Sequence, residues 1–181
     1  MNIIPCHLEG LLTIEPDVYD DSRGFFLESW NRHRYHEAGI AADFVQDNFS
    51  LSRQGTLRGL HFQNPMAQAK LVSVWQGEVF DVAVDIRRRS PTFGQWYGLN
   101  LSADNKRQLF IPPGFAHGFA VLSASALFHY KCTELYSPKD ELGFRWNDPA
   151  IGITWPVAGP VLSKRDAGAP LLRELPDERL F

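Results

Sequence analysis

Cysteine is scarce in this chain of 181 residues, which carries only Cys6 and Cys132. Two isolated thiols cannot build the disulfide framework on which small secreted domains depend. Long hydrophobic runs are also missing, since no stretch approaches the roughly 18 apolar residues of a membrane span. The first residues lack the basic-then-apolar pattern of a secretory signal. We therefore expect a cytoplasmic protein that does not enter a membrane.

An excess of positive charge is missing too. The chain has 18 Lys and Arg against 21 Asp and Glu, which gives a formal net charge of −3. This balance argues against a nucleic acid polymer or an anionic membrane as the partner. The composition is otherwise ordinary for a globular protein, with 44% apolar and 22% charged residues and no internal repeat. We expect one domain over residues 1–181.

Short segments rich in β-branched and aromatic residues alternate with turn signals, a pattern typical of an antiparallel sandwich or barrel. Helix is scarce: residues 31–38, stopped by Gly39, form the best candidate, and Ser163 followed by Asp166 resembles the N-cap of a short helical turn. The sequence therefore predicts an all-β fold with few short helices. The predicted strands are residues 10–15, 24–30, 44–51, 57–63, 70–75, 78–85, 96–101, 108–111, 118–122 and 126–133.

The segment IPPGFAHGF, residues 111–119, contains the pattern Pro-x-Gly-x-x-His. It resembles the second motif of the cupin superfamily, whose fold is a jelly roll or small barrel. Metal-dependent cupins supply His-x-His and a Glu from their first motif, which is a donor set for a transition metal. Here His61 is followed by Gln63 in place of the second His, and no Glu comes before Glu78. We therefore expect no bound metal, which argues against a metal cupin such as a dioxygenase.

Several longer strings make the resemblance specific to the dTDP-4-dehydrorhamnose 3,5-epimerase family. They are RGFFLESW (23–30), FVQDNFSLS (44–52), LRGLHFQ (57–63), GEVFDVAVDIRRRSPTFGQW (77–96), QLFIPPGFAHGF (108–119), HYKCTELYSPKDE (129–141), WNDPAIGITWP (146–156) and LSKRD (162–166). The resemblance implies a cupin-like homodimer that uses neither metal nor cofactor. Its reaction would invert C3 and C5 of dTDP-4-keto-6-deoxy-D-glucose and give dTDP-4-keto-L-rhamnose.

Two other functions stay open at this point. A single-site 3- or 5-epimerase of another dTDP-deoxysugar pathway would share the same acid–base machinery. A non-catalytic cupin that binds sugar nucleotides belongs to a different class, and it would be expected to have lost the base or the acid. The residues expected as the base and the acid, His61 and Tyr130, are both present, which favours an enzyme.

Both inverted carbons lie next to the C4 ketone, so removing either proton gives an enolate with its charge on the C4 oxygen. The reaction needs a base, a proton donor on the opposite face and a cation or hydrogen-bond donor at that oxygen. By resemblance His61 is the base, Asp166 the carboxylate that orients it, and Tyr130 the acid. Lys70, which stands among apolar residues, is the natural partner of the enolate oxygen. The structural alternatives are a hydrogen-bonded strand histidine, a helix cap, a core aromatic and a solvated lysine.

Binding the nucleotide requires cations for two phosphates, and guanidinium groups suit phosphate oxygens. By resemblance Arg23 and Arg58 fill this role. The same resemblance assigns substrate contacts to Glu28, Gln46, Asn48, His117, Glu141 and Arg165. Lys70 is also expected to contact the substrate, and Phe26 is a candidate among the aromatic residues for lining the pocket. The family often has Lys where Arg165 stands, so this residue is a departure. Asp81 is expected behind the site, in support of His61 or Lys70.

Two local features call for a structural answer. Simple alternation along residues 57–63 places Arg58 and His61 on opposite faces of the strand. A bulge at Gly59, a position of Arg58 near the strand end, or its use by a partner subunit would each reconcile them. The basic run 87–89 follows a predicted strand and precedes Ser90, and it is predicted to be a solvated turn.

Overall fold

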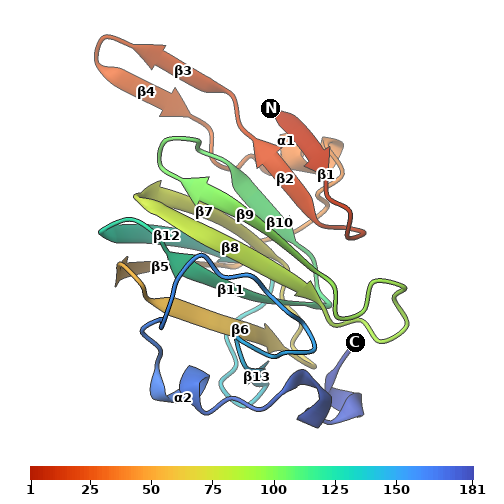
Figure 1. Ribbon diagram of the computed structural model, residues 1–181. Helices are drawn as coiled ribbons and strands as arrows, with labels where there is room; N and C mark the ends of the chain where they lie inside the picture. Colours follow the sequence, from red (N-terminus) through yellow and green to blue (C-terminus); the bar gives the residue numbers. More distant parts are fainter.

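Two antiparallel sheets face each other and form the body of the computed structural model, which describes residues 1–181 (Figure 1). The six-stranded sheet contains, in spatial order, β1 (Asn2–Pro5), β2 (Leu12–Glu15), β10 (Gln108–Ile111), β7 (Lys70–Gln76), β12 (Ser125–Cys132) and β5 (Gln46–Arg53). The five-stranded sheet contains β13 (Glu141–Gly143), β6 (Leu57–Gln63), β11 (Phe115–Val121), β8 (Glu78–Asp85) and β9 (Trp96–Ser102). A separate hairpin joins β3 (Val18–Asp21) and β4 (Gly24–Leu27).

Helices are few and short, as predicted. They are α1 (Arg32–Glu37), α2 (Lys164–Ala167) and the 3₁₀ turns η1 (Leu172–Glu174) and η2 (Asp177–Arg179). Asn31 caps α1 by accepting a hydrogen bond from the Arg34 backbone N–H, and Ser163 caps α2 by accepting from the Asp166 N–H. No helix is long and apolar enough to cross a membrane. The predicted all-β class with few helices is confirmed.

The main core fills the space between the two sheets. Phe128 of β12 and Val72 of β7 meet Phe119 and Phe115 of β11 there, and the rings of Phe119 and Phe128 stack with centroids 4.0 Å apart. Two further clusters cover parts of the outer faces. One packs α1 against the six-stranded sheet, and the other packs the C-terminal segment, blue in Figure 1, against the five-stranded sheet.

Several predicted strands have wrong ends, and three strands were not predicted. The strand predicted at 118–122 begins at Phe115, and the one predicted at 24–30 ends at Leu27. Strands β1, β3 and β13 were missed because they are short and lie at sheet edges or in the hairpin, where polar residues and Pro5 weaken the hydrophobic pattern. The central strands, which are buried on both faces or alternate clearly, were found.

Strand β6 contains the irregularity that reconciles Arg58 with His61. His61 pairs with His117 and Arg58 with Phe119, so three steps along β6 match two steps along β11. Gly59 lies in this extra step with φ of +125°, a backbone conformation that only glycine adopts readily. Of the three alternatives left open by the sequence, the structure shows the bulge at Gly59, and both side chains reach the same pocket.

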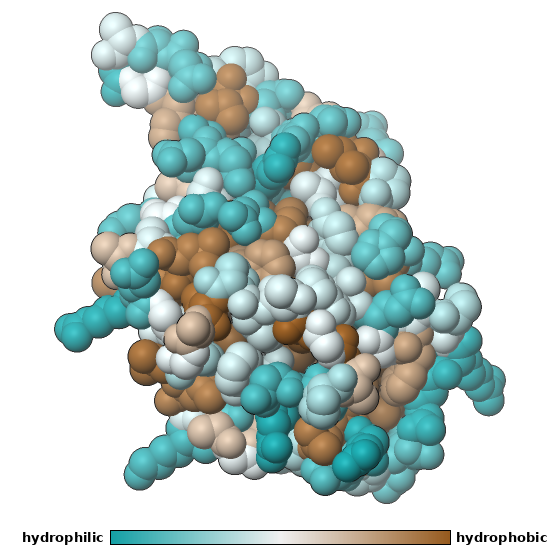
Figure 2. Space-filling view, viewed as in Figure 1, coloured by the Kyte–Doolittle hydropathy of each residue, from teal (hydrophilic) through white to brown (hydrophobic).

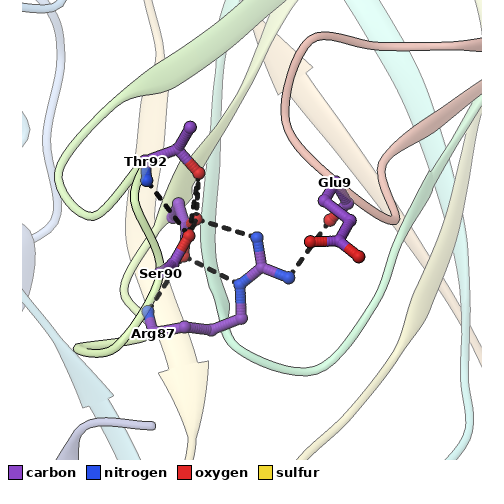
Figure 3. Close-up of polar contacts among 5 residues, drawn as sticks. Glu9, Arg87, Ser90 and Thr92 are labelled. Atoms are coloured by element: carbon purple, nitrogen blue, oxygen red, sulfur yellow. Dashed lines mark hydrogen bonds and ion pairs between the residues drawn. The ribbon is translucent and has the colours of Figure 1, made fainter.

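The loop after β8 is held by a buried carboxylate (Figure 3). The Asp85 side chain is fully buried and accepts hydrogen bonds from Arg87 Nε at 2.9 Å, Ser90 Oγ at 2.6 Å and Thr92 Oγ1 at 2.6 Å. Arg87 Nη1 also donates to the Glu9 carbonyl, and its guanidinium lies 4.6 Å from the centre of the Phe115 ring. The prediction of a solvated turn is therefore wrong for Arg87, whose side chain is only 27% exposed, because the buried Asp85 carboxylate requires a paired charge.

Candidate active site

A pocket of about 410 Å³ opens between the two sheets. Side chains from both sheets and from α2 line it. The residues predicted for the site that line this pocket are Gln46, Asn48, Arg58, His61, Lys70, His117, Tyr130, Glu141, Arg165 and Asp166. The structure thus brings together residues from distant parts of the chain, and it brings the whole predicted acid–base set into one cavity.

His61 and Asp166 form a hydrogen-bonded pair at the edge of this pocket. His61 Nε2 lies 2.6 Å from Asp166 Oδ1, and the Asp166 side chain is almost completely buried while that of His61 is partly exposed. Burial opposes ionisation of Asp166, but the hydrogen bond from His61 and the helix cap at Ser163 offset it and lower the pKa of this carboxyl. Because a carboxylate only accepts, Nε2 donates and Nδ1 is left free to take a proton.

Tyr130 and Lys70 come from the opposite sheet. Tyr130 lies on β12 and Lys70 on β7, and Lys70 Nζ is 6.0 Å from the centre of the Tyr130 ring. Burial lowers the pKa of Lys70, against the opposing effects of Cys132, Glu141 and Asp81. Burial also raises the pKa of Tyr130. A base on one sheet and a phenol on the other therefore face a common space, with an ammonium group beside the phenol.

Asp81 pairs with His117 rather than with His61. Its two carboxylate oxygens lie 3.1 and 2.9 Å from His117 Nε2, and both side chains are buried. The expected support of His61 is not seen as a hydrogen bond. The link to Lys70 is electrostatic only, since the charge of Asp81 favours the protonated lysine.

The pocket mouth is framed by polar contacts between loops. Tyr136 OH donates to Glu141 Oε2 at 2.9 Å, and the Arg165 guanidinium pairs with the same carboxylate. Elsewhere in the pocket lining, the exposed Arg58 donates from Nε to Ser52 Oγ at 3.1 Å. The Tyr136–Glu141–Arg165 contacts tie the loop after β12 to α2, the helix that carries Asp166.

Several lining residues were not predicted from the sequence, among them Cys132 and Gln68. Cys132 lies two positions after Tyr130 on the same strand, so the strand period of two could have placed it in the pocket. Gln68 lies in an irregular segment between β6 and β7, where no period applies.

Three predicted substrate contacts do not reach the pocket of their own chain. Arg23 and Phe26 lie on the β3–β4 hairpin, which projects from the body at the top of Figure 1. The Arg23 side chain is 88% exposed and pairs with Asp21, and Phe26 is 69% exposed. Glu28 accepts a hydrogen bond from Asn31 and pairs with a helix arginine instead. Within one chain these residues are separate from the other predicted contacts.

No group of three or more His, Cys, Asp or Glu side chains is arranged so that it could hold a metal ion. The functional side chains that converge on the pocket are a base, a phenol and several cations. Such a set suits an anionic, oxygen-rich ligand and a proton transfer.

Comparisons with known proteins agree with this geometry. The model of the family described as dTDP-4-dehydrorhamnose 3,5-epimerase matches residues 5–174. The dTDP-4-dehydrorhamnose 3,5-epimerase of Salmonella typhimurium is 57% identical over 175 residues, which cover 95% of this chain and 96% of that protein. The corresponding enzyme of Shigella flexneri is 56% identical over 92% of this chain and 93% of its own.

Solved structures give the same result. The crystal structure of dTDP-6-deoxy-D-glucose-3,5-epimerase from Legionella pneumophila, in complex with dTDP-4-keto-L-rhamnose, matches with a TM-score of 0.96. It is 56% identical, and the match covers 99% of this chain and 96% of that one. The fold and the comparisons define an isomerase built on a cupin-like antiparallel barrel. The chain belongs to the dTDP-4-dehydrorhamnose 3,5-epimerase family.

Proposed function

We propose that this epimerase inverts both C3 and C5 of dTDP-4-keto-6-deoxy-D-glucose and releases dTDP-4-keto-L-rhamnose, without a metal or an organic cofactor. One observation carries the proposal: the His61–Asp166 pair faces Tyr130 and Lys70 across a single pocket. The two faces of a sugar ring held between the sheets would meet a base on one side and an acid on the other.

The proposed chemistry uses each group in one role. His61 Nδ1 removes the proton next to the C4 ketone, and the Asp166 carboxylate stabilises the imidazolium that forms. The Lys70 ammonium stabilises the charge that develops on the C4 oxygen. Tyr130 then delivers its phenolic proton to the opposite face of the carbon, which inverts the centre.

The nucleotide would be held by the remaining polar side chains of the pocket. Arg58 contributes a guanidinium for the diphosphate from the same wall as His61. Gln46 and Asn48 line the neighbouring wall, and their side chains are already joined by a 2.8 Å hydrogen bond. Glu141 and Arg165 frame the mouth.

We also propose that the protein acts as a homodimer in the cytoplasm. On β5, Phe49 and Leu51 are more than 60% exposed, and apolar side chains also reach the surface on the face of the body shown in Figure 2. A second copy would cover such a surface. The hairpin that carries Arg23 and Phe26 does not reach its own pocket, so in a dimer it is available to the partner subunit.

Isotope exchange tests the reaction. The protein is incubated with dTDP-4-keto-6-deoxy-D-glucose in deuterated water, and the label is located by NMR. Label at both C3 and C5 is the expected result. Label at one carbon would identify a single-site epimerase, and no label would rule out the proposed enzyme.

The dimer has its own test. Light scattering coupled to size-exclusion chromatography should give twice the mass of one chain, and mixing inactive His61→Asn protein with Arg23→Ala protein should restore part of the activity. A monomeric mass, or no gain on mixing in a confirmed mixed dimer, would contradict this part of the proposal.

A further inference from the structure

The pocket contains a second histidine–carboxylate pair with the same hydrogen-bonding pattern as the first. In both pairs Nε2 is bonded to a buried carboxylate, His61 to Asp166 and His117 to Asp81. Each Nδ1 makes no hydrogen bond within the chain, so each is a free proton acceptor in the neutral histidine. The proposed reaction uses only one of the two.

The two histidines are also neighbours. His61 and His117 are directly paired across β6 and β11, and both line the pocket. Side chains of directly opposed residues share one face of a sheet, with Cβ atoms about 4.5–5.5 Å apart. In the relay proposed below, a water molecule or a sugar hydroxyl between the two rings would join them.

The substrate supplies the reason for a second acceptor. In a gluco-configured ring with equatorial substituents, the hydrogens at C3 and C5 are axial and point to the same face. One base on that face therefore serves both carbons, but it is protonated after the first inversion. His61 must lose that proton before it can act again on the same bound sugar.

We propose that His117 relays this proton, an inference that rests on the function proposed above. His117 takes the proton from His61 between the two inversions. Asp81 is the positioning residue that keeps His117 ready to accept the proton. Asp81 fixes the Nε2–H tautomer of His117 and would stabilise the imidazolium formed by the transfer. The ring of Phe128, stacked at 6.0 Å, limits rotation of His117.

The proton count closes over two inversions. In the first, the C–H bond breaks with its electron pair left in the enolate, an Nδ1–H bond forms on His61, and Tyr130 gives its O–H proton to carbon. In the relay, the Nδ1–H bond of His61 breaks and one forms on His117. Tyr130 regains a proton from solvent at the pocket mouth. After the second inversion, both histidines release their protons to solvent with the product, and Tyr130 takes up a second proton from solvent.

Charged groups of both signs surround His117. Asp81 on β8 faces it directly, His61 lies across the strand pair, and the cations Lys70 and Arg58 line the same pocket. The Asp81 carboxylate would stabilise an imidazolium at His117 while the relay holds the proton.

The test separates the first inversion from the second. Wild-type protein and the variants His117→Asn, Asp81→Asn and His61→Asn are mixed with saturating dTDP-4-keto-6-deoxy-D-glucose, quenched at millisecond intervals and analysed for singly and doubly inverted sugar. His33→Asn, on the exposed face of α1, is the matched control. Binding of dTDP to each variant confirms an intact pocket.

We expect His117→Asn to slow the second inversion on the order of 10²-fold more than the first, so that singly inverted sugar accumulates. Asp81→Asn should show the same pattern with a smaller effect, and it serves as the readout if His117→Asn does not fold. His61→Asn should lose both inversions.

Two results would overturn the relay. One is a higher KM with no accumulation of singly inverted sugar, which would make His117 a binding residue only. The other is equal slowing of both inversions. If the wild-type protein itself performs neither inversion, the proposed function fails, a result distinct from both.

Discussion

Two buried carboxylates in this molecule have different partners and different consequences. Asp85 is fully buried and is satisfied by a permanent cation, Arg87, together with two hydroxyl groups. Asp166 is nearly as buried, yet its side-chain partner is His61, an imidazole that can take up and release a proton. A carboxylate paired with a fixed charge stabilises a loop, whereas one paired with a titratable ring can support proton transfer.

The largest expected effect follows from removing the titratable partner. His61→Ala should lower the exchange rate by roughly 10⁴-fold, because no other group takes the proton from carbon. Solvent exchange followed by NMR measures this loss, while calorimetry with dTDP should show unchanged binding. Exchange at the wild-type rate would refute the assignment of the base.

Asp166→Asn should have the next largest effect. The amide can still accept the hydrogen bond from His61, but it does not stabilise the imidazolium by charge. We expect kcat to fall by roughly 10²-fold with little change in KM. Steady-state kinetics at saturating substrate provide the measurement, and a rise in KM alone would place Asp166 in binding instead.

Asp85→Asn should lower stability and leave activity unchanged, whereas the two preceding substitutions lower activity. It leaves the Arg87 guanidinium without its buried counter-charge, so we expect the free energy of unfolding to fall by about 3 kcal/mol. The activity of the folded enzyme should stay near that of the wild type. Urea denaturation and active-site titration together test this, and lost activity in fully folded protein would show that the two regions are coupled.

The pH dependence of stability also tests the structural role of Asp85. Burial opposes ionisation of Asp85, but its hydrogen bonds outweigh this and lower its pKa from 3.8 to about 2. Because the folded pKa is below the unfolded one, Asp85 stabilises the protein above about pH 4, by about 2 kcal/mol, and the contribution is lost as the pH falls toward 2. The stability gap between wild type and Asp85→Asn should therefore narrow between pH 6 and pH 3 in urea titrations.

The smallest expected effect is that of a chelator. Neither carboxylate belongs to a group of three metal-binding side chains, and the proposed chemistry needs no metal. Treatment with EDTA should leave kcat unchanged within the error of the assay. A loss that Zn²⁺ or Fe²⁺ restores would require a different mechanism.

Sequence patterns predicted the fold class and the acid–base residues, for different reasons. Alternation and turn residues predicted the central strands, and the short motif strings predicted the convergence of His61 and Asp166, which are 105 positions apart. No local pattern could supply that convergence by itself. Arg58 was ambiguous until the register of β6 against β11 resolved it.

The partners of buried side chains were the least predictable part. Asp81 could have supported either His61 or Lys70, and only the tertiary packing pairs it with His117. Arg87 belonged to a polar run that indicated solvent, whereas the buried Asp85 draws it inward. The position of the β3–β4 hairpin relative to the pocket likewise depends on packing that no local period encodes.

The bulge in β6 has a consequence for how such sequences diverge. A Cβ atom on Gly59 would lie 2.5 Å from Gly118 Cα, and one on Gly118 would lie 2.7 Å from the Arg58 carbonyl oxygen. Both contacts are with backbone atoms, so each position has to lack a side chain, and no change in a neighbouring side chain can compensate a substitution. The LRGLH string and the final glycine of the Pro-x-Gly-x-x-His-Gly string form a single evolutionary unit: drift at either position would change the shared register, and with it the placement of Arg58 beside His61.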